Sequence, residues 1–511
     1  MRLITTARFF VALAFCSSSS FAGDILILKD GRIFECDKMV RTAIGIEITF
    51  KNGVVQVPSD SIQDAVLASD ATLPPATDEE KVNAEKGLVR FEGKWVPLKR
   101  REELVAKKLA QKKAEIESIR SHGEWRNRYI EETKPFRYEY TVPPHIFAEF
   151  KDAMEAYYQQ FVKTWRITTK SSDPKLPVNI YYDEKSYHQV SGAPNGALAY
   201  FRFVKPWDLN TYYERLDPEY SKHVLYHEAN HYLQLLVDTS FAVPHFPGEA
   251  LAEYYGASSW NPTTKKFETG LIQEGRLCEI QTDIAGGERL TLETLITTEG
   301  MYQHYTWGWS LVHYLMNDTR YADKFQKFFF ALSKSRDAKR EKMDVDNLST
   351  MKQDEVWKLF RAELGLKDAD AVRKLETDWY NYIDQKLVLV TASGLAKAGF
   401  AAAGTNRPIK ARRFFKEAIE KGSTNPLVFH RYAELLEMDG KSSDAKAMLE
   451  KAIALNPLEG KFYNALGHRL KMKDNPEGSR WIALGEELGY EDDWIDLSEI
   501  DPKGKGKDKG N

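Results

Sequence analysis

Short runs of alternating apolar and polar residues occupy the first part of the chain, between residues 24 and 67. This alternation predicts β-strands, because successive side chains of a strand point to opposite faces. Two of the runs are separated by Asp30-Gly31 and two by Asn52-Gly53, dipeptides that favour tight turns between antiparallel strands. We therefore predict a small β-barrel-like module over residues 24–67, with a role in interaction or spacing.

A charged segment, residues 68–133, follows this module. It contains the pair Pro74-Pro75, then an expected short hairpin between 87 and 96, and then an expected helix over 99–120 in which Lys, Arg and Glu alternate with Ala and Leu. Interleaved charges of both signs are typical of a helix that faces solvent. We interpret the segment as a linker.

The pattern changes near residue 134. Apolar runs near 136–142, 178–182 and 197–203 predict strands, and an amphipathic pattern over 144–165 predicts a helix. Helical periodicity then dominates to about residue 390. The predicted fold class is α+β, with a mainly helical domain over 134–390 that contains a small sheet.

The last hundred residues contain a repeat. One unit matches the tetratricopeptide pattern of about 34 residues, and weaker units flank it on both sides. Three helix pairs over 391–490 would form a short α-solenoid, a surface on which we expect a protein partner. The Gly- and Lys-rich end, 491–511, predicts disorder. The residues at the tetratricopeptide offsets are Phe429, Tyr432, Ala433, Leu436, Ala445, Leu449, Ala452 and Pro457.

Composition and charge reduce the number of function classes that the sequence allows. The chain has 511 residues, of which 42% are hydrophobic and 29% are charged, and its formal net charge is −3. These values are ordinary for globular domains. The near balance of charges argues against a general nucleic-acid or membrane-surface binder. No stretch after the first residues is apolar for long enough to predict a transmembrane helix.

The first residues resemble a secretory signal peptide. Basic residues precede an apolar run from Phe9 to Cys16, and small residues follow, so we expect cleavage after Ala22 and a periplasmic or extracellular protein. We do not expect lipid anchoring, because bulky Phe15 stands where a lipoprotein signal needs a small residue. The remaining cysteines, Cys36 and Cys278, could pair or could both be buried free thiols.

The segment His227-Glu228-Ala229-Asn230-His231 carries the strongest chemical signal. On a helix, residues four apart lie on one face, so His227 and His231 could share a metal ion. Glu228 is turned away from that line, where a carboxylate can act as general base on a water molecule. A helix that carries these residues for ordinary surface reasons is the alternative.

A third ligand is available downstream. Pro247-Gly248 predicts the start of a helix, which places Glu249 in its first turn and Glu253 one turn later on the same side. Catalytic zinc needs three protein ligands and one open position. We assign Glu249 as the third ligand and Glu253 as the acceptor of the second N–H of a ligand histidine. Two surface carboxylates are the weaker alternative.

With these residues in place, the segment 134–390 resembles the gluzincin metallopeptidases. It is most similar to peptidase-MA-like bacterial proteins that often carry tetratricopeptide repeats. The resemblance implies one zinc ion, a peptide or protein substrate that binds along the strand edge near 197–203, and an aromatic oxyanion donor. We nominate Tyr305 as that donor, with a core aromatic as its alternative reading. Tyr302 and His304 compete for the role.

One local departure from these families precedes the third ligand. They usually have Trp-Leu-x-Glu-Gly there, whereas this chain has His245-Phe246-Pro247-Gly248-Glu249-Ala250. We expect His245 and His313 to be structural, and His223 to be exposed on the helix.

The sequence therefore predicts an exported zinc metallopeptidase. Two other functions stay open. One is a catalytically inactive scaffold that binds proteins through the repeats and the β-module, although the intact Glu228 argues against it. The other is zinc-dependent hydrolysis of a different bond, such as a cell-wall amide.

Overall fold

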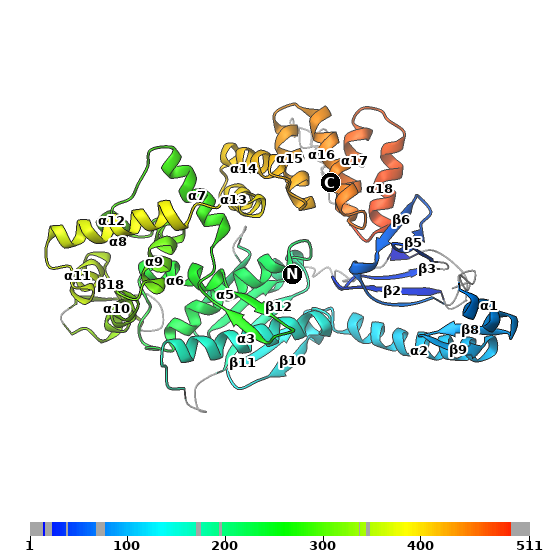
Figure 1. Cartoon of the computed structure of the whole chain (residues 1–511), viewed down its shortest axis with the longest axis horizontal. Helices are drawn as coiled ribbons and strands as arrows, with labels where there is room; N and C mark the ends of the chain where they lie inside the picture. Colours follow the sequence, from blue (N-terminus) through cyan, green and yellow to red (C-terminus); the bar gives the residue numbers. More distant parts are fainter. Residues whose placement is uncertain are drawn as a thin grey trace, which may run out of the picture. The chain divides into compact units, whose positions relative to one another are not determined.

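The computed structural model describes residues 14–15, 23–36, 39–67, 77–169, 175–193, 197–336, 338–343 and 348–491. They form two compact units, which Figure 1 colours along the chain. One unit is Ala114–Val428, and the other combines the described parts of Phe10–Lys113 and Phe429–Asn511. The expected signal peptide lies outside the described residues except for the backbone of Ala14–Phe15. Linker residues 68–76 and the expected tail from 492 onward also lie outside them.

Strands β2 to β7 form the N-terminal module as two small sheets. The first sheet has the order β1-β3-β2-β7, in which the two-residue strand β1 adds to β3, and the second has the order β4-β5-β6. Both sheets contribute to one apolar core. The Asp30-Gly31 turn joins β2 to β3, and the Asn52-Gly53 turn joins β5 to β6, as these dipeptides predict. The elements are β1 (Ala14–Phe15), β2 (Asp24–Leu28), β3 (Ile33–Cys36), β4 (Met39–Thr42), β5 (Gly45–Thr49), β6 (Val54–Pro58), η1 (Ser59–Ser61) and β7 (Ile62–Val66).

The charged segment forms the expected hairpin and helix. Lys112 on the helix lies 3.0 Å from Asp64 of β7, so an ion pair ties the helix to the module. The elements are α1 (Asp78–Glu85), β8 (Leu88–Phe91), β9 (Lys94–Pro97) and α2 (Leu98–Ser121).

The unit that holds the module also holds four C-terminal helices. Their interior is built from small and large apolar side chains, including Ala433, Leu449 and Leu466. The helices α17 and α18 pack closely, since a Cβ on Gly467 would lie 2.7 Å from the Gly478 carbonyl oxygen. The helices are α15 (Pro426–Met438), α16 (Ser442–Leu455), α17 (Gly460–Lys471) and α18 (Glu477–Glu487).

The β-module and the last helices share one core. Leu484 of α18 and Leu488, directly after it, pack with Leu26 and Ile48 of the module. The Asn52 side chain donates a hydrogen bond of 2.8 Å to a carboxylate oxygen of Glu487. Segments from the two ends of the sequence therefore fold as one body.

A five-stranded sheet lies in the other unit. Its order is β10-β11-β12-β14-β13, in which β11, β12 and β14 are parallel and the outer strands β10 and β13 are antiparallel to their neighbours. The sheet begins ahead of residue 134, and β14 was not expected from the sequence. The elements are η2 (Trp125–Asn127), β10 (Tyr129–Glu132), β11 (Phe136–Tyr140), α3 (Pro144–Thr164), β12 (Leu176–Tyr181), α4 (Glu184–Ser191), β13 (Ala199–Arg202) and β14 (Asp208–Tyr212).

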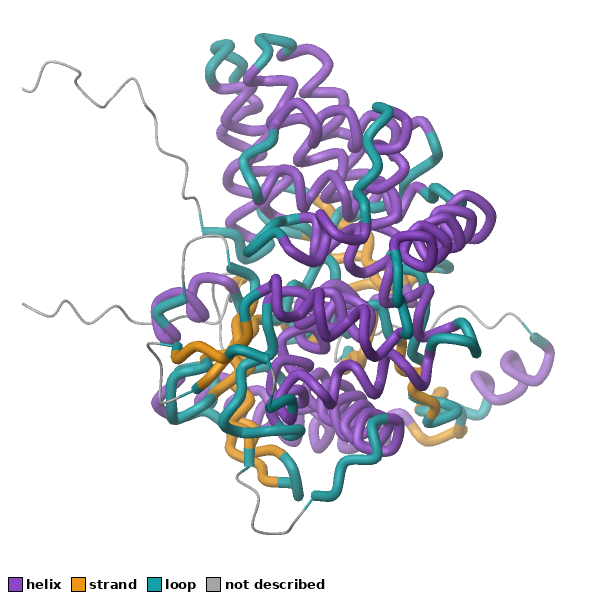
Figure 2. Tube along the Cα trace, turned by 90° about the vertical axis from the view of Figure 1, so that its left-hand side faces the viewer, coloured by secondary structure: helices purple, strands orange, loops and turns teal. Residues whose placement is uncertain are grey.

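Helices make up most of the rest of this unit. Figure 2 draws the helices of the chain in purple. The helix expected to carry His227 and His231 is present as α5, and the first of the three predicted repeat pairs is α13 with α14. The helices are α5 (Pro218–Leu235), α6 (His245–Gly256), α7 (Glu274–Ala285), α8 (Leu292–Thr297), the π-helix η3 (His304–Gly308), α9 (Trp309–Asn317), α10 (Ala322–Lys334), α11 (Gln353–Leu364), α12 (Ala369–Lys386), α13 (Ala392–Gly404) and α14 (Pro408–Glu420). Two hairpins, β15 (Ser259–Asn261) with β16 (Lys266–Glu268) and β17 (Arg340–Lys342) with β18 (Ser349–Met351), lie between them.

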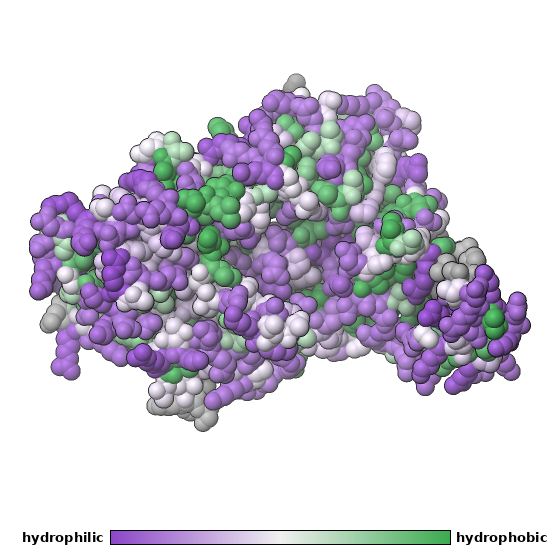
Figure 3. All heavy atoms as spheres, viewed as in Figure 1, coloured by the Kyte–Doolittle hydropathy of each residue, from purple (hydrophilic) through white to green (hydrophobic). Residues whose placement is uncertain are grey.

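The architecture is thus mainly helical with small sheets and a helical C-terminal stretch. Much of the face in Figure 3 is hydrophilic, with hydrophobic side chains in scattered groups. Within the described ranges no helix combines the length and apolar character needed to cross a bilayer. Cys36 and Cys278 are both buried free thiols.

Candidate metal centre

Helix α5 presents the two histidines of the motif. The helix begins after Asp217, whose carboxylate accepts a hydrogen bond of 3.1 Å from the Tyr220 N–H, and Pro218 occupies its first turn. His227 and His231 lie on one face, with exposed fractions of only 9% and 8%. The local sequence therefore fixes both imidazoles on the side of α5 that faces α6.

Buried polar side chains join α5 to α6 beside these histidines. Gln234 donates hydrogen bonds to the Gly248 carbonyl oxygen at 2.9 Å and to Asn230 Oδ1 at 2.7 Å. Asn230 in turn donates to the Tyr157 hydroxyl at 2.7 Å. Because Gly248 directly precedes Glu249, these bonds hold the backbone of the third candidate ligand. Asn230 and Gln234 were not predicted from the sequence, although two amides four residues apart among apolar helix positions indicate a buried polar contact.

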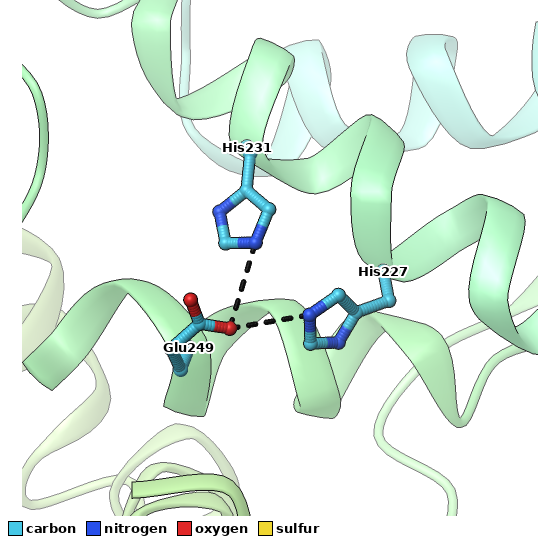
Figure 4. Close-up of side chains that lie close together, drawn as sticks. All are labelled: His227, His231 and Glu249. Carbon is cyan, nitrogen blue, oxygen red and sulfur yellow. Dashed lines mark ion pairs between the residues drawn. The ribbon is translucent and has the colours of Figure 1, made fainter. Parts of the chain in front are cut away.

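The three candidate ligands converge (Figure 4). Glu249 Oε2 lies 3.2 Å from His227 Nε2 and 3.5 Å from His231 Nε2. One ligand atom from each residue lies within 4.8 Å of the others. Ligands about 2.0–2.1 Å from a tetrahedral zinc ion are about 3.3 Å apart, so the two Glu249 distances fit a shared zinc ion.

The surroundings of Glu249 also fit a cation. Its Oε2 is buried and has no aligned hydrogen-bond donor within the described part of the chain. A buried carboxylate oxygen without such a donor is costly unless a positive charge compensates it. Two neutral imidazoles and one carboxylate form a donor set that suits zinc.

The acidic residues around His227 create a negative potential that raises the pKa of this histidine. Burial by itself would lower the pKa of His227, but the carboxylates of Glu249, Glu253 and Glu228 outweigh burial and raise that pKa to about 9. In the metal-free chain a proton on His227 thus supplies the positive charge that the acidic residues favour.

Glu253 lies behind His227. Its Oε1 is 3.6 Å from His227 Nδ1 and 2.6 Å from Arg276 Nη2, and its Oε2 accepts a hydrogen bond of 3.0 Å from Gln273. Burial raises the pKa of Glu253, but Arg276 and the neighbouring histidines lower it to about 2. The carboxylate is therefore ionised, which suits an acceptor that orients the His227 ring.

Glu228 lies between the three candidate ligands and the sheet edge. Its Oε2 accepts a hydrogen bond of 2.8 Å from the Phe201 N–H of β13. Burial raises the pKa of Glu228, and the opposing effect of His227 and His231 only partly offsets it. A carboxyl group with a raised pKa beside a candidate metal site matches the proton affinity of a general base.

Of the three candidate oxyanion donors, Tyr305 is the one whose ring lies against a candidate ligand. It sits in the π-helix η3, and its ring stacks on the His227 ring with centroids 6.0 Å apart and an interplanar angle of 18°. Single-turn π-helices of this kind are frequent at functional sites. Burial and the charges of Glu249, Glu253 and Glu228 raise the pKa of Tyr305. Its hydroxyl therefore stays protonated and can donate.

Tyr302 and His304 are engaged elsewhere. The Tyr302 hydroxyl donates to Glu279 Oε1 at 3.0 Å and accepts from Arg276 Nη1 at 2.9 Å. His304 is fully buried, donates from Nε2 to the Leu295 carbonyl oxygen at 2.7 Å, and has its Nδ1 2.6 Å from His245 Nδ1.

Two further histidines, His313 and His223, contact groups other than the three candidate ligands. His313 is buried, and its two ring nitrogens contact the Gly270 carbonyl oxygen at 3.0 Å and the Tyr382 hydroxyl at 2.8 Å. His223 is not the exposed residue that the sequence suggested. Its side chain is 19% exposed and lies 3.0 Å from Gln273 Nε2, and burial lowers its pKa to about 4.

Comparison with known proteins assigns no family to the chain. No family model matches the sequence, and no curated protein matches it. A crystal structure of MamA is 15% identical over 26% of this chain and 77% of its own, with a TM-score of 0.19. A structure described as MamA AMB-1 is 17% identical over 36% of this chain and 98% of its own, also with a TM-score of 0.19. TM-scores this low establish neither fold nor function.

Proposed function

We propose that the protein is an exported zinc-dependent hydrolase and that its substrate is a peptide. The observation that carries the proposal is the convergence of His227 Nε2, His231 Nε2 and Glu249 Oε2 at distances that suit one tetrahedral ion. The buried and ionised Glu253 behind His227 supports it, because catalytic zinc sites hold the second nitrogen of a ligand histidine in this way.

Each catalytic residue has one task in this proposal. A bound zinc ion would polarise the scissile carbonyl and make an attacking water molecule more acidic. Glu228 accepts the proton of that water and passes it to the leaving group. Tyr305 donates a hydrogen bond to the oxygen on which negative charge develops.

The sheet edge supports a peptide as substrate. Strand β13 is an outer strand of the five-stranded sheet, and the Phe201 N–H on it reaches the Glu228 carboxylate. An extended chain that adds to this edge by main-chain hydrogen bonds would run past Glu228. The resemblance of residues 134–390 to gluzincin peptidases favours the same placement.

An inactive scaffold is the second candidate function. It would use the C-terminal helix pairs, which we propose are tetratricopeptide-like repeats, and the β-module to bind proteins. Hydrolysis of a cell-wall amide is the third candidate. The retained Glu228 beside the ligand cluster favours an active enzyme over a scaffold.

Metal analysis and a matched pair of variants test the proposal. We expect one zinc ion per chain, lost in His231→Ala and kept in His122→Ala, because His122 bonds to the Ser118 carbonyl oxygen and not to an acidic residue. A wild-type protein that binds no zinc would refute the metal site.

A second pair of variants tests catalysis. Glu228→Gln should keep zinc and lose peptide hydrolysis, whereas Glu219→Gln should keep both, because the Glu219 side chain on the same helix is 75% exposed. Equal cleavage by Glu228→Gln and wild type would show that Glu228 is not the base. A parallel screen of peptide libraries and cell-wall fragments separates the two substrate classes, and zinc binding without turnover of either favours the scaffold.

A further inference from the structure

The first predicted repeat pair packs directly on helix α7 of the metal-binding unit. The close approach uses glycines, since a Cβ on Gly394 of α13 would lie 2.9 Å from Cys278 Sγ and one on Gly275 of α7 would lie 2.9 Å from Lys397 Cβ. Thr391 at the start of α13 donates a hydrogen bond of 3.0 Å to Glu274. Helices α13 and α14 therefore belong to this unit and pack against it.

One side chain of this pair enters the polar network beside the metal cluster. Arg407, at the start of α14, has its Nη2 3.4 Å from Glu279 Oε2, and its guanidinium lies over the Tyr302 ring at 4.7 Å from the centroid. The same Glu279 lies 3.2 Å from Arg276 Nη1 and accepts the Tyr302 hydrogen bond. Arg276 makes the 2.6 Å contact with Glu253.

These groups form a chain of alternating charge. It runs from Arg407 through Glu279 and Arg276 to Glu253, which lies against His227. The side chains are 29% exposed at Arg407, 8% at Glu279, 17% at Arg276 and 2% at Glu253, so both carboxylates are buried. Two carboxylates and two guanidinium groups balance each other, and Arg276 can be held at Glu253 because Arg407 supplies a second cation to Glu279.

We infer that Arg407 is a positioning residue of the metal site and that the first helix pair serves the site rather than a repeat partner. The inference rests on the proposed function, and it concerns how His227 is held. Without Arg407, Arg276 becomes the main counter-ion of two buried carboxylates and is drawn toward Glu279. Glu253 then loses its closest donor, and the His227 ring is less well oriented.

Loss of Arg407 would also affect the position of Tyr305, the proposed oxyanion donor. The Arg276 guanidinium lies over the Tyr302 ring at 5.7 Å and over the Tyr305 ring at 5.4 Å. A shift of Arg276 would therefore move Tyr305 relative to His227. Misplaced donors act on the transition state more than on substrate binding, so kcat should fall while KM changes little.

The test compares Arg407→Ala with Arg413→Ala. Arg413 also joins α14 to α7, through a 3.0 Å hydrogen bond to Thr282, but it has no part in the charge chain. Mutation of residues that directly support metal ligands costs about 10–100-fold in metal affinity. Arg407 acts one step further away, so we expect Arg407→Ala to weaken zinc binding about 3–10-fold, measured by competition with a chromophoric chelator. We expect Arg413→Ala to stay near wild type.

A conservative variant and peptide kinetics complete the test. Arg407→Lys keeps the charge but not the planar stack on Tyr302, so it should recover part of the zinc affinity. Equal zinc affinity and equal kcat for Arg407→Ala and Arg413→Ala, with zinc bound to wild type, would overturn the inference and leave the proposed function intact. A wild-type chain that binds no zinc would overturn both.

Discussion

Zinc binding should compete with a proton at His227, and the strength of that competition follows from the metal-free site. The neighbouring carboxylates raise the pKa of His227 to about 9. Only the neutral imidazole can ligate a metal ion, so His227 must lose its proton when zinc binds. Raising the pH removes the proton beforehand and should strengthen zinc binding.

The free-energy cost of deprotonating His227 follows from the difference between pH 7 and its pKa. Two pH units below a pKa of about 9, roughly one molecule in a hundred has a neutral His227, which costs about 3 kcal/mol. Zinc affinity should therefore rise about tenfold per pH unit between 7 and 8.5 and level off above pH 9. Over the same range the metal-free fold loses stability, because a raised histidine pKa stabilises the folded state fully below about pH 6.5 and this contribution disappears as the pH passes about 9.

Isothermal titration of zinc in buffers with different ionisation enthalpies measures the released protons. We expect close to one proton per zinc ion from His227 at pH 7 and far fewer at pH 9.5. Glu253→Gln provides the control, since the lost charge should lower the His227 pKa and move the pH dependence to lower values. Zinc affinity that is constant between pH 7 and 8.5, or binding at pH 7 without proton release, would refute the reasoning.

Three further results are expected. Tyr305→Phe should keep zinc and lower kcat about 100-fold, as for the loss of one oxyanion donor; an unchanged kcat would leave Tyr305 as a core aromatic. Asn230→Ala should lower the free energy of unfolding by about 1–3 kcal/mol in urea titrations, because it leaves the Tyr157 and Gln234 partners without a buried bond; a smaller loss would indicate that water replaces the amide. Asn52→Ala should cost about 1–2 kcal/mol, because Glu487 loses a neutral donor at 2.8 Å; equal stability to wild type would show that the contact does not hold the module.

Local spacing was sufficient to predict which three side chains converge. Residues four apart on a helix must share a face, and a helix start at Pro247-Gly248 places Glu249 in its first turn, so His227, His231 and Glu249 could be named without tertiary information. The structure brings these three together, and their roles as zinc ligands stay predictions.

The polar residues around the cluster could not be found in the same way. Arg276 and Arg407 reach Glu253 and Glu279 through contacts between helices that are distant in sequence, and no local pattern distinguishes them from other arginines. Strand β14 was missed because Asp208–Tyr212 carries polar residues that are buried in the sheet, including Asn210 and Thr211 at 1% exposure. Its sequence therefore lacks the alternation that reveals a half-exposed strand.

The shared core of the β-module and the last helices has a consequence for how the chain folds. The strands with Leu26 and Ile48 are made before residues 68–425, whereas Leu484 of α18 and the adjacent Leu488, which cover the same core, are made after them. Contacts between such distant segments form slowly, because the whole intervening chain must first be closed into a loop. During that interval the strands of the module expose apolar surface, and a newly made chain would need protection from aggregation until α18 is available.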